Sequence, residues 1–268
     1  MKFIFPVIIL LFACATKGFN SKKATKLDLS IWNNKKYQFA VLIHDLKTGK
    51  YSYWNDSLIA IRYTPASTFK IANTIIGLET KAVQDITTTL EWDSTVYKNP
   101  KWNHSQDMRS AFINSTVWYY QALARKIGAE KMQNHLTEFA YGNTSCKGAI
   151  DSFWLNGELK ISLFEQVQFM DKIVNKKLSI RPEIYEKLEK LMFLKKVGNY
   201  SVYGKTGWGE QDSTSVGWLV GYAIDGDSKV TFATLILSKH PEDFDFAAYR
   251  KNITFTALNR AGYIKDNE

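Results

Sequence analysis

The order of the predicted elements constrains the fold of this chain more than any single residue does. Apolar, β-prone segments lie towards both ends, and helical patterns fill the middle. The predicted strands cover Gln38 to Ile43, Tyr51 to Trp54, Tyr200 to Tyr203, Val216 to Ala223 and Val230 to Leu237. Strands from the two ends can complete one sheet only by pairing with each other, so the chain cannot be a simple alternation of strands and helices.

Apolar residues spaced three and four apart predict the helices. They cover Phe69 to Leu78, Val117 to Ile127, Glu130 to Ala140, Leu163 to Val174, Pro182 to Leu194 and Phe246 to Leu258. We therefore predict an α/β (α+β) fold. An antiparallel sheet built from both termini is flanked by helices, and a mostly helical second lobe packs against it. The crevice between the two lobes is the natural place for a site.

The first residues predict export from the cytoplasm. Residues 1–15 have a positive start and an apolar run that is too short to span a bilayer, as in a secretory signal. Cleavage after Ala15 would leave residues 16–268 as a catalytic domain in the periplasm, without an integral membrane span. The alternative is a lipoprotein signal that leaves a lipid on Cys14, but Phe12 is bulky for that motif.

Cysteine, histidine and charge exclude several classes of protein. Only Cys146 certainly remains after export, so no intramolecular disulfide is expected. The histidines are scattered singly, and we predict no metal site. The net charge of +9 comes from dispersed lysines rather than a basic patch, so we expect no nucleic-acid partner but a basic surface that steers anionic substrates.

Ser67-Thr68-Phe69-Lys70 is the only S-x-x-K in the chain. Residues three apart share one face of a helix, so a neutral amine there can take the proton of the serine hydroxyl. The competing reading is a helix-capping serine beside a solvated lysine. Apolar neighbours such as Ile71 and Ala72 favour an enclosed lysine instead, and enclosure lowers the pKa of an amine.

The K-T-G motif occurs twice, and its surroundings distinguish the copies. Lys47-Thr48-Gly49 lies between two predicted strands and is assigned to a hairpin turn. Lys205-Thr206-Gly207 follows the strand at Tyr200 to Tyr203 and continues into Trp208. The second copy is therefore the candidate for a functional strand.

Taken in order, these motifs resemble the penicillin-recognising serine enzymes, and among them the class D β-lactamases (oxacillinases). The resemblance covers nearly all of the chain beyond the export segment. Besides the S-x-x-K and the second K-T-G, it rests on Ser115-Thr116-Val117, Tyr141-Gly142-Asn143 and Phe153-Trp154-Leu155. Class A enzymes would have Ser-Asp-Asn in place of the S-x-V motif.

The resemblance implies which residues form the nucleophile and its general base. Ser67 would be the nucleophile, and Lys70 would carry a carbamate formed from CO2, with no other cofactor. Val117 and Leu155 would enclose that group, and the indole N–H of Trp154 would donate to it. Trp154 as an ordinary core aromatic is the alternative.

The resemblance also implies how substrate is held. Ser115 and Lys205 would pass a proton to the nitrogen of the lactam. Backbone N–H groups of Ser67 and Trp208 would hold the oxyanion. Thr206 and Arg250 would bind the substrate carboxylate, with Gly207 in the same strand, although a solvated Arg250 is the alternative. The expected partner is a small β-lactam, and the chain would be a monomer or a homodimer.

Two rival functions share these motifs. The extracellular sensor domains of β-lactam receptors resemble class D enzymes but stay acylated, and several membrane helices precede them; only an export segment is expected here. A D,D-peptidase of the cell wall would bring further domains or a membrane anchor. The sequence favours hydrolysis of β-lactams, and it does not indicate which β-lactams are preferred.

Overall fold

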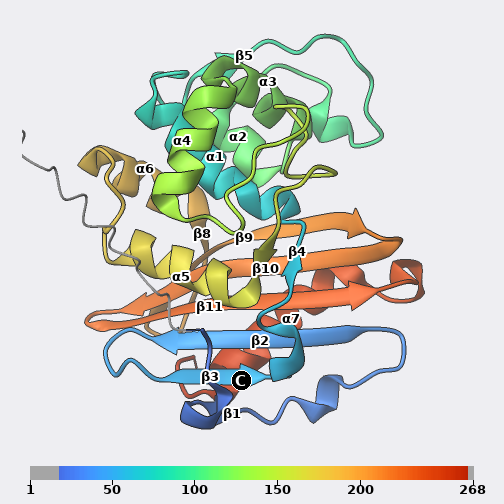
Figure 1. Cartoon of the computed structure of the whole chain (residues 1–268), viewed down its shortest axis with the longest axis vertical. Helices are drawn as coiled ribbons and strands as arrows, with labels where there is room; N and C mark the ends of the chain where they lie inside the picture. Colours follow the sequence, from blue (N-terminus) through green and yellow to red (C-terminus); the bar gives the residue numbers. More distant parts are fainter. Residues whose placement is uncertain (1–17, 265–268) are drawn as a thin grey trace, which may run out of the picture.

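The computed structural model describes residues 18–264, and within them seven strands form one sheet (Figure 1). The strand order is β1-β3-β2-β11-β10-β9-β8. The bounds are β1 Thr25–Lys26, β2 Gln38–Asp45, β3 Tyr51–Trp54, β8 Phe193–Val197, β9 Tyr200–Gln211, β10 Thr214–Asp225 and β11 Ser228–Ser238. β11 is the central strand, and its pairing with β2 joins the two ends of the chain as predicted. All neighbours are antiparallel except β1 and β3, which are parallel.

One helix covers each face of this sheet. α5 (Leu163–Val174) lies on one face and α7 (Phe246–Arg260) on the other (Figure 1). Successive residues of a strand point to opposite faces, so β11 contributes to two separate cores: Phe232 and Ile236 pack with α7, while Leu235 packs on the side of α5. Burial on both faces explains why β10 and β11 are apolar almost throughout.

The second lobe is mostly helical and lies beside the β8–β9 end of the sheet (Figure 1). Its helices are α1 (Lys70–Glu79), α2 (Met108–Ile113), α3 (Val117–Ile127), α4 (Ala129–Phe139) and α6 (Pro182–Met192). α1 packs against α3, where a Cβ on Gly77 would lie 2.8 Å from Leu123 Cδ1. Two small sheets complete the fold, β4 (Arg62–Tyr63) with β7 (Ile161–Ser162) and β5 (Thr89–Leu90) with β6 (Gln106–Asp107).

The structure differs from the expected elements in several places; for example, β9 runs to Gln211 rather than ending at Tyr203, and α2 was not expected. The predicted helix from Pro182 to Leu194 ends at Met192, and the chain continues as edge strand β8. Leu194 lies three residues after Leu191 and so continues the helical spacing, but pairing with β9 overrides it. Leu163–Val174 was expected in the helical middle, yet α5 covers the sheet instead.

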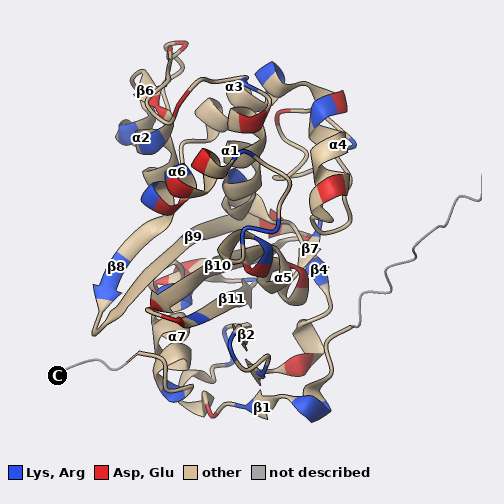
Figure 2. Cartoon of the chain, turned by 90° about the vertical axis from the view of Figure 1, so that its left-hand side faces the viewer, with Lys and Arg blue, Asp and Glu red and all other residues tan. Residues whose placement is uncertain are grey.

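The export segment, including Cys14, lies outside the described residues. None of the helices in residues 18–264 is long and apolar enough to cross a membrane. The same residues contain no group of His, Cys, Asp and Glu that could hold a metal ion. Figure 2 shows Lys and Arg on both lobes, interspersed with Asp and Glu.

Candidate active site

The nucleophile motif forms a tight turn that leads directly into α1. Residues Ala66–Phe69 form a short 3-10 helix, η4, and Ala66 has a φ of +47°. Lys70 follows as the first residue of α1, and its Nζ donates a hydrogen bond to Ser67 Oγ at 2.9 Å. Lys70 is fully buried, whereas Ser67 keeps 9% of its surface exposed. A reacting group could therefore reach the serine while solvent is kept from the lysine.

Burial sets the protonation state of Lys70. Removal from water disfavours the ammonium and lowers the pKa of Lys70 to about 7. The ring of Tyr120 lies beside the amine, with its centroid 5.1 Å from Nζ. Asn73 and Thr74, on the next turn of α1, hold Tyr120 through its carbonyl and its hydroxyl. A large fraction of Lys70 is thus a neutral amine near pH 7.

Trp154 is hydrogen-bonded to the nucleophile turn and to the residues just before it. Its carbonyl accepts hydrogen bonds from Ala66 N at 3.1 Å and from Thr64 Oγ1 at 3.0 Å, and its ring packs against Phe69. Its indole N–H is buried and has no hydrogen-bond partner among the described residues. A buried donor without an acceptor is unusual, and a carboxylate oxygen at this point would accept its hydrogen bond. Leu155, which follows it, is half-buried.

The Tyr141-Gly142-Asn143 motif anchors the loop that carries Trp154. Asn143 donates to the carbonyl of Glu158 and exchanges two hydrogen bonds with the backbone of Lys160. Gly142 has a φ of +55°, and a Cβ there would lie 2.2 Å from the carbonyl oxygen of Lys160. Only glycine fits this approach.

Ser115 and Lys205 come together from the two lobes. Ser115 precedes α3 with a φ of +53°, and its Oγ accepts a hydrogen bond from Lys205 Nζ. Burial, followed by the positive charges of Lys70, Arg250 and Lys251, holds the pKa of Lys205 well below its ordinary value. Val117, the first residue of α3, is half-buried.

Strand β9 lies against the nucleophile turn. Its pairing with β8 ends at Tyr203, so the part from residue 204 onwards is paired with β10 alone. A Cβ on Gly207 would lie 3.0 Å from Pro65 O and 3.1 Å from Thr68 Cγ2. The glycine of the K-T-G motif therefore lets the strand approach η4 closely.

Arg250 reaches the same strand from α7. Its Nη1 donates to the carbonyl of Gly207 at 2.5 Å, and its guanidinium lies 6.0 Å from the ring centroid of Trp208. Burial lowers the pKa of Arg250 to about 10, while Asp245 opposes the shift. Trp208 is 49% exposed, and Thr206 is half-buried. The alternative of a solvated Arg250 is excluded, because only 8% of its surface is exposed.

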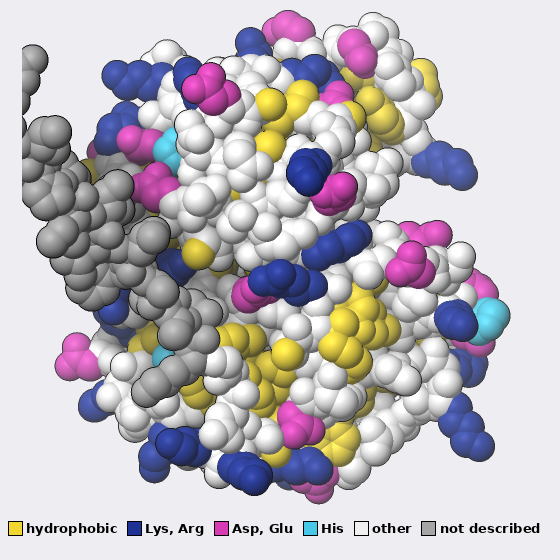
Figure 3. Space-filling view, viewed as in Figure 1, with side chains coloured by type: hydrophobic (Ala, Val, Ile, Leu, Met, Phe, Trp, Pro, Cys, Tyr) yellow, Lys and Arg dark blue, Asp and Glu magenta, His cyan; other side chains and the backbone are white. Residues whose placement is uncertain are grey.

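The site lies where the two lobes meet. In the space-filling view the outline of the molecule is notched between the helical lobe and the sheet, on the right (Figure 3). Contacts connect most of the predicted residues here: Lys70 with Ser67, Lys205 with Ser115, Arg250 with Gly207 and Trp208, and Trp154 and Gly207 with the nucleophile turn. Val117, Leu155 and Thr206 lie next to these residues in the sequence. The first K-T-G copy lies in the turn between β2 and β3, with a φ of +68° at Gly49.

Sequence reasoning missed the residues that hold this arrangement together. Gln211 Oε1 accepts a hydrogen bond from Thr64 N at 2.9 Å, and Trp218 Nε1 donates to Thr64 O at the same distance. Gln166 donates to Thr68 Oγ1 beside the nucleophile. These are isolated polar residues outside any motif, so nothing in their local sequence marks them.

The sequence is similar to a penicillin-binding domain family and to β-lactamases. The family described as "Penicillin binding protein transpeptidase domain" matches residues 24–258. Probable β-lactamase YbxI of Bacillus subtilis is 35% identical over 223 residues, which cover 83% of this chain and 80% of that protein. β-Lactamase OXA-48 of Klebsiella pneumoniae is 33% identical, with 68% of each chain covered.

Solved structures show the same similarity. A class D β-lactamase from Sebaldella termitidis superimposes with a TM-score of 0.85 at 32% identity, covering 91% of this chain and 100% of that one. The C-terminal domain of the BlaR penicillin receptor of Bacillus licheniformis has a TM-score of 0.83 at 26% identity, covering 90% and 98%. The fold is thus shared by enzymes and by a receptor.

Proposed function

This chain belongs to the class D β-lactamases, and from that premise we propose that it hydrolyses β-lactam antibiotics through an acyl-enzyme on Ser67 and so confers resistance to them. The observation that carries the proposal is the contact of 2.9 Å between the fully buried amine of Lys70 and the hydroxyl of Ser67. A serine becomes a nucleophile only when an adjacent base removes its proton. The low pKa of Lys70, about 7, keeps a base available near neutral pH.

The first half of the reaction follows from the positions of the hydroxyls. Ser67 Oγ attacks the lactam carbonyl, a C–O bond forms, and the C–N bond of the strained ring breaks. The departing nitrogen takes a proton from Ser115 Oγ, which Lys205 Nζ holds in place through its hydrogen bond. The ammonium form of Lys205 can replace the proton that Ser115 gives up, and burial makes it a better proton donor because burial lowers the pKa of this group.

Three observations fit a carbamate on Lys70. The amine is buried, its pKa of about 7 leaves about half of it neutral at pH 7, and Trp154 offers an indole N–H with no partner in the described residues. Val117 and Leu155 would form the apolar walls, and Trp154 would donate to the group. When present, the carbamate would supply the general base for acylation and for hydrolysis of the acyl-enzyme.

The strand beyond Lys205 would bind the rest of the substrate. Arg250 and Thr206 would hold the carboxylate of the drug, with Gly207 allowing the strand to lie against the nucleophile turn. Trp208 is exposed beside them and would contact the side chain of the drug. N–H groups of Ser67 and Trp208 would bind the oxyanion. Location in the periplasm, and a lipid on Cys14 as the alternative, belong to the same proposal.

The receptor similarity supplies the second candidate, a sensor that remains acylated. A chromogenic cephalosporin separates the two functions. We expect continuous turnover by the wild type, none by Ser67→Ala, and unchanged turnover by the exposed control Ser179→Ala. One equivalent of product followed by no further reaction would assign the chain to the sensors.

A further inference from the structure

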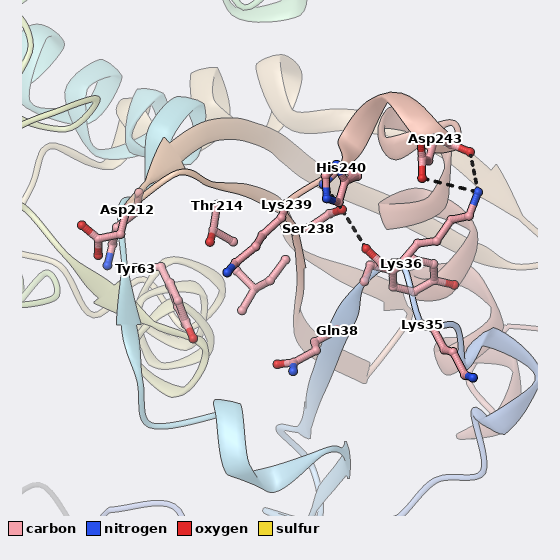
Figure 4. Close-up of a pocket in the computed structure, with 13 residues that line it drawn as sticks. Lys35, Lys36, Gln38, Tyr63, Asp212, Thr214, Ser238, Lys239, His240 and Asp243 are labelled. Carbon is pink, nitrogen blue, oxygen red and sulfur yellow. Dashed lines mark hydrogen bonds and ion pairs between the residues drawn. The ribbon is translucent and has the colours of Figure 1, made fainter.

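A second hollow lies at the far end of the sheet from the β2–β3 turn. Its volume is about 590 Å³, within the range of small-molecule sites. It lies between the start of β2, the end of β11, the β9–β10 hairpin and β4 (Figure 4).

Most of the charge around this hollow is already paired or points elsewhere. Lys36 Nζ lies 3.6 Å from Asp243 Oδ2, so these two residues neutralise each other. His240 faces Glu242 at 3.3 Å, and Lys35 points away from the hollow in Figure 4. Asp212 lies on the opposite side of Tyr63 from Lys239 in that view. The charge that remains over the hollow is the ammonium of Lys239.

Lys239 is surrounded by neutral polar groups. Its side chain extends into the space bordered by the phenol of Tyr63, the hydroxyl of Thr214 and the amide of Gln38 (Figure 4). No hydrogen bond or ion pair joins these four side chains to another residue that lines the hollow. Leu237 and the ring of Tyr63 add apolar surface.

This combination defines a class of ligand. One ammonium matches one carboxylate, and the hydroxyl and amide groups can complete its hydrogen bonds. The aromatic and aliphatic walls suit a ring attached to that carboxylate. We propose that the hollow is a binding site for small organic monocarboxylates that carry an apolar ring, separate from the catalytic centre.

Binding of 4-fluorobenzoate, followed by fluorine NMR, tests this proposal without requiring turnover. We expect saturable binding to the wild type that weakens at least tenfold in Lys239→Glu. The matched control is Lys47→Glu, which changes the net charge equally. Lys47 follows Asp45, the other end of β2, which lies about 24 Å along the strand from Gln38. The Lys47→Glu variant should therefore bind as the wild type does.

Two further measurements separate this hollow from the site of Arg250. Arg250→Ala should retain the binding that Lys239→Glu loses, and uncharged 4-fluorobenzamide should bind at least tenfold more weakly than the acid. Absence of saturable binding, equal binding by Lys239→Glu, or loss of binding in Arg250→Ala alone would overturn the proposal. None of these binding results depends on whether the protein hydrolyses β-lactams.

Discussion

Replacing Lys70 with methionine should make the folded protein more stable while abolishing its activity. An exposed lysine has a pKa of 10.5, and burial lowers that of Lys70 to about 7. Between these two values the unfolded chain binds a proton that the folded chain does not. The penalty for burying Lys70 is therefore fully present below pH 7, falls as the pH rises, and vanishes above the unfolded value.

The pKa shift of Lys70 gives the size of the expected gain in folding free energy. A difference of 3.5 pKa units between 10.5 and about 7 corresponds to a loss of about 4 kcal/mol of folding free energy at pH 7 and about 2 kcal/mol at pH 9. Methionine fills a similar volume without a charge. The variant loses the hydrogen bond to Ser67, worth about 1 kcal/mol, so a net gain of about 3 kcal/mol is expected at pH 7.

Urea denaturation in CO2-depleted buffer at pH 7 and pH 9 measures this gain. The advantage of Lys70→Met should shrink by about 2 kcal/mol between the two pH values. The control Lys131→Met replaces an exposed lysine of α4 and should show no such dependence. A variant less stable than the wild type at pH 7, or an advantage that is independent of pH, would refute the account of Lys70 as a buried neutral amine.

Three further predictions concern the reaction. In buffer equilibrated with air the rate should fall about tenfold for each pH unit below 7, because a protonated Lys70 cannot form the carbamate, and added bicarbonate should restore it; a flat profile would contradict this. Trp154→Phe keeps the packing but removes the donor, so deacylation should slow by about tenfold to a hundredfold in burst kinetics, and an unchanged burst would count against the role of the indole. Gly207→Ala places a Cβ 3.0 Å from Pro65 O, so kcat/KM should fall about tenfold; Gly18→Ala, with nothing within 4 Å, is the control, and equal values for both would exclude the close approach.

Long-range pairing marks the limit of what the sequence could predict about the fold. The β-prone runs at both ends and the helix of Leu163–Val174 carry strong periodic patterns, and the structure has strands and a helix at these residues, although the helix packs on the sheet rather than in the helical lobe. Strand β8 could not be found in this way. Its residues Phe193–Val197 are mostly exposed and follow a helix whose apolar spacing they continue, so only the contact with β9 decides their structure.

Some residues of the candidate site could likewise be identified from the sequence, and others could not. Ser67, Lys70 and Lys205 belong to motifs whose residue types follow from the chemistry, so sequence reasoning could identify them. Gln211 could not be identified, because its contact with Thr64 spans 147 residues and depends on the β9–β10 hairpin reaching the nucleophile turn. The burial of Lys70 was inferred from apolar neighbours, and the structure confirms it.

Carbon-13 NMR of the protein in labelled bicarbonate, with and without nitrogen-15 in its lysines, tests the central claim most directly. A carbamate on Lys70 should give one labelled signal near neutral pH that couples to lysine nitrogen, disappears in Lys70→Met, and weakens as the pH falls below 7. If the active wild-type protein turns over β-lactam while no such signal forms, Lys70 acts unmodified and the proposed catalytic base is wrong.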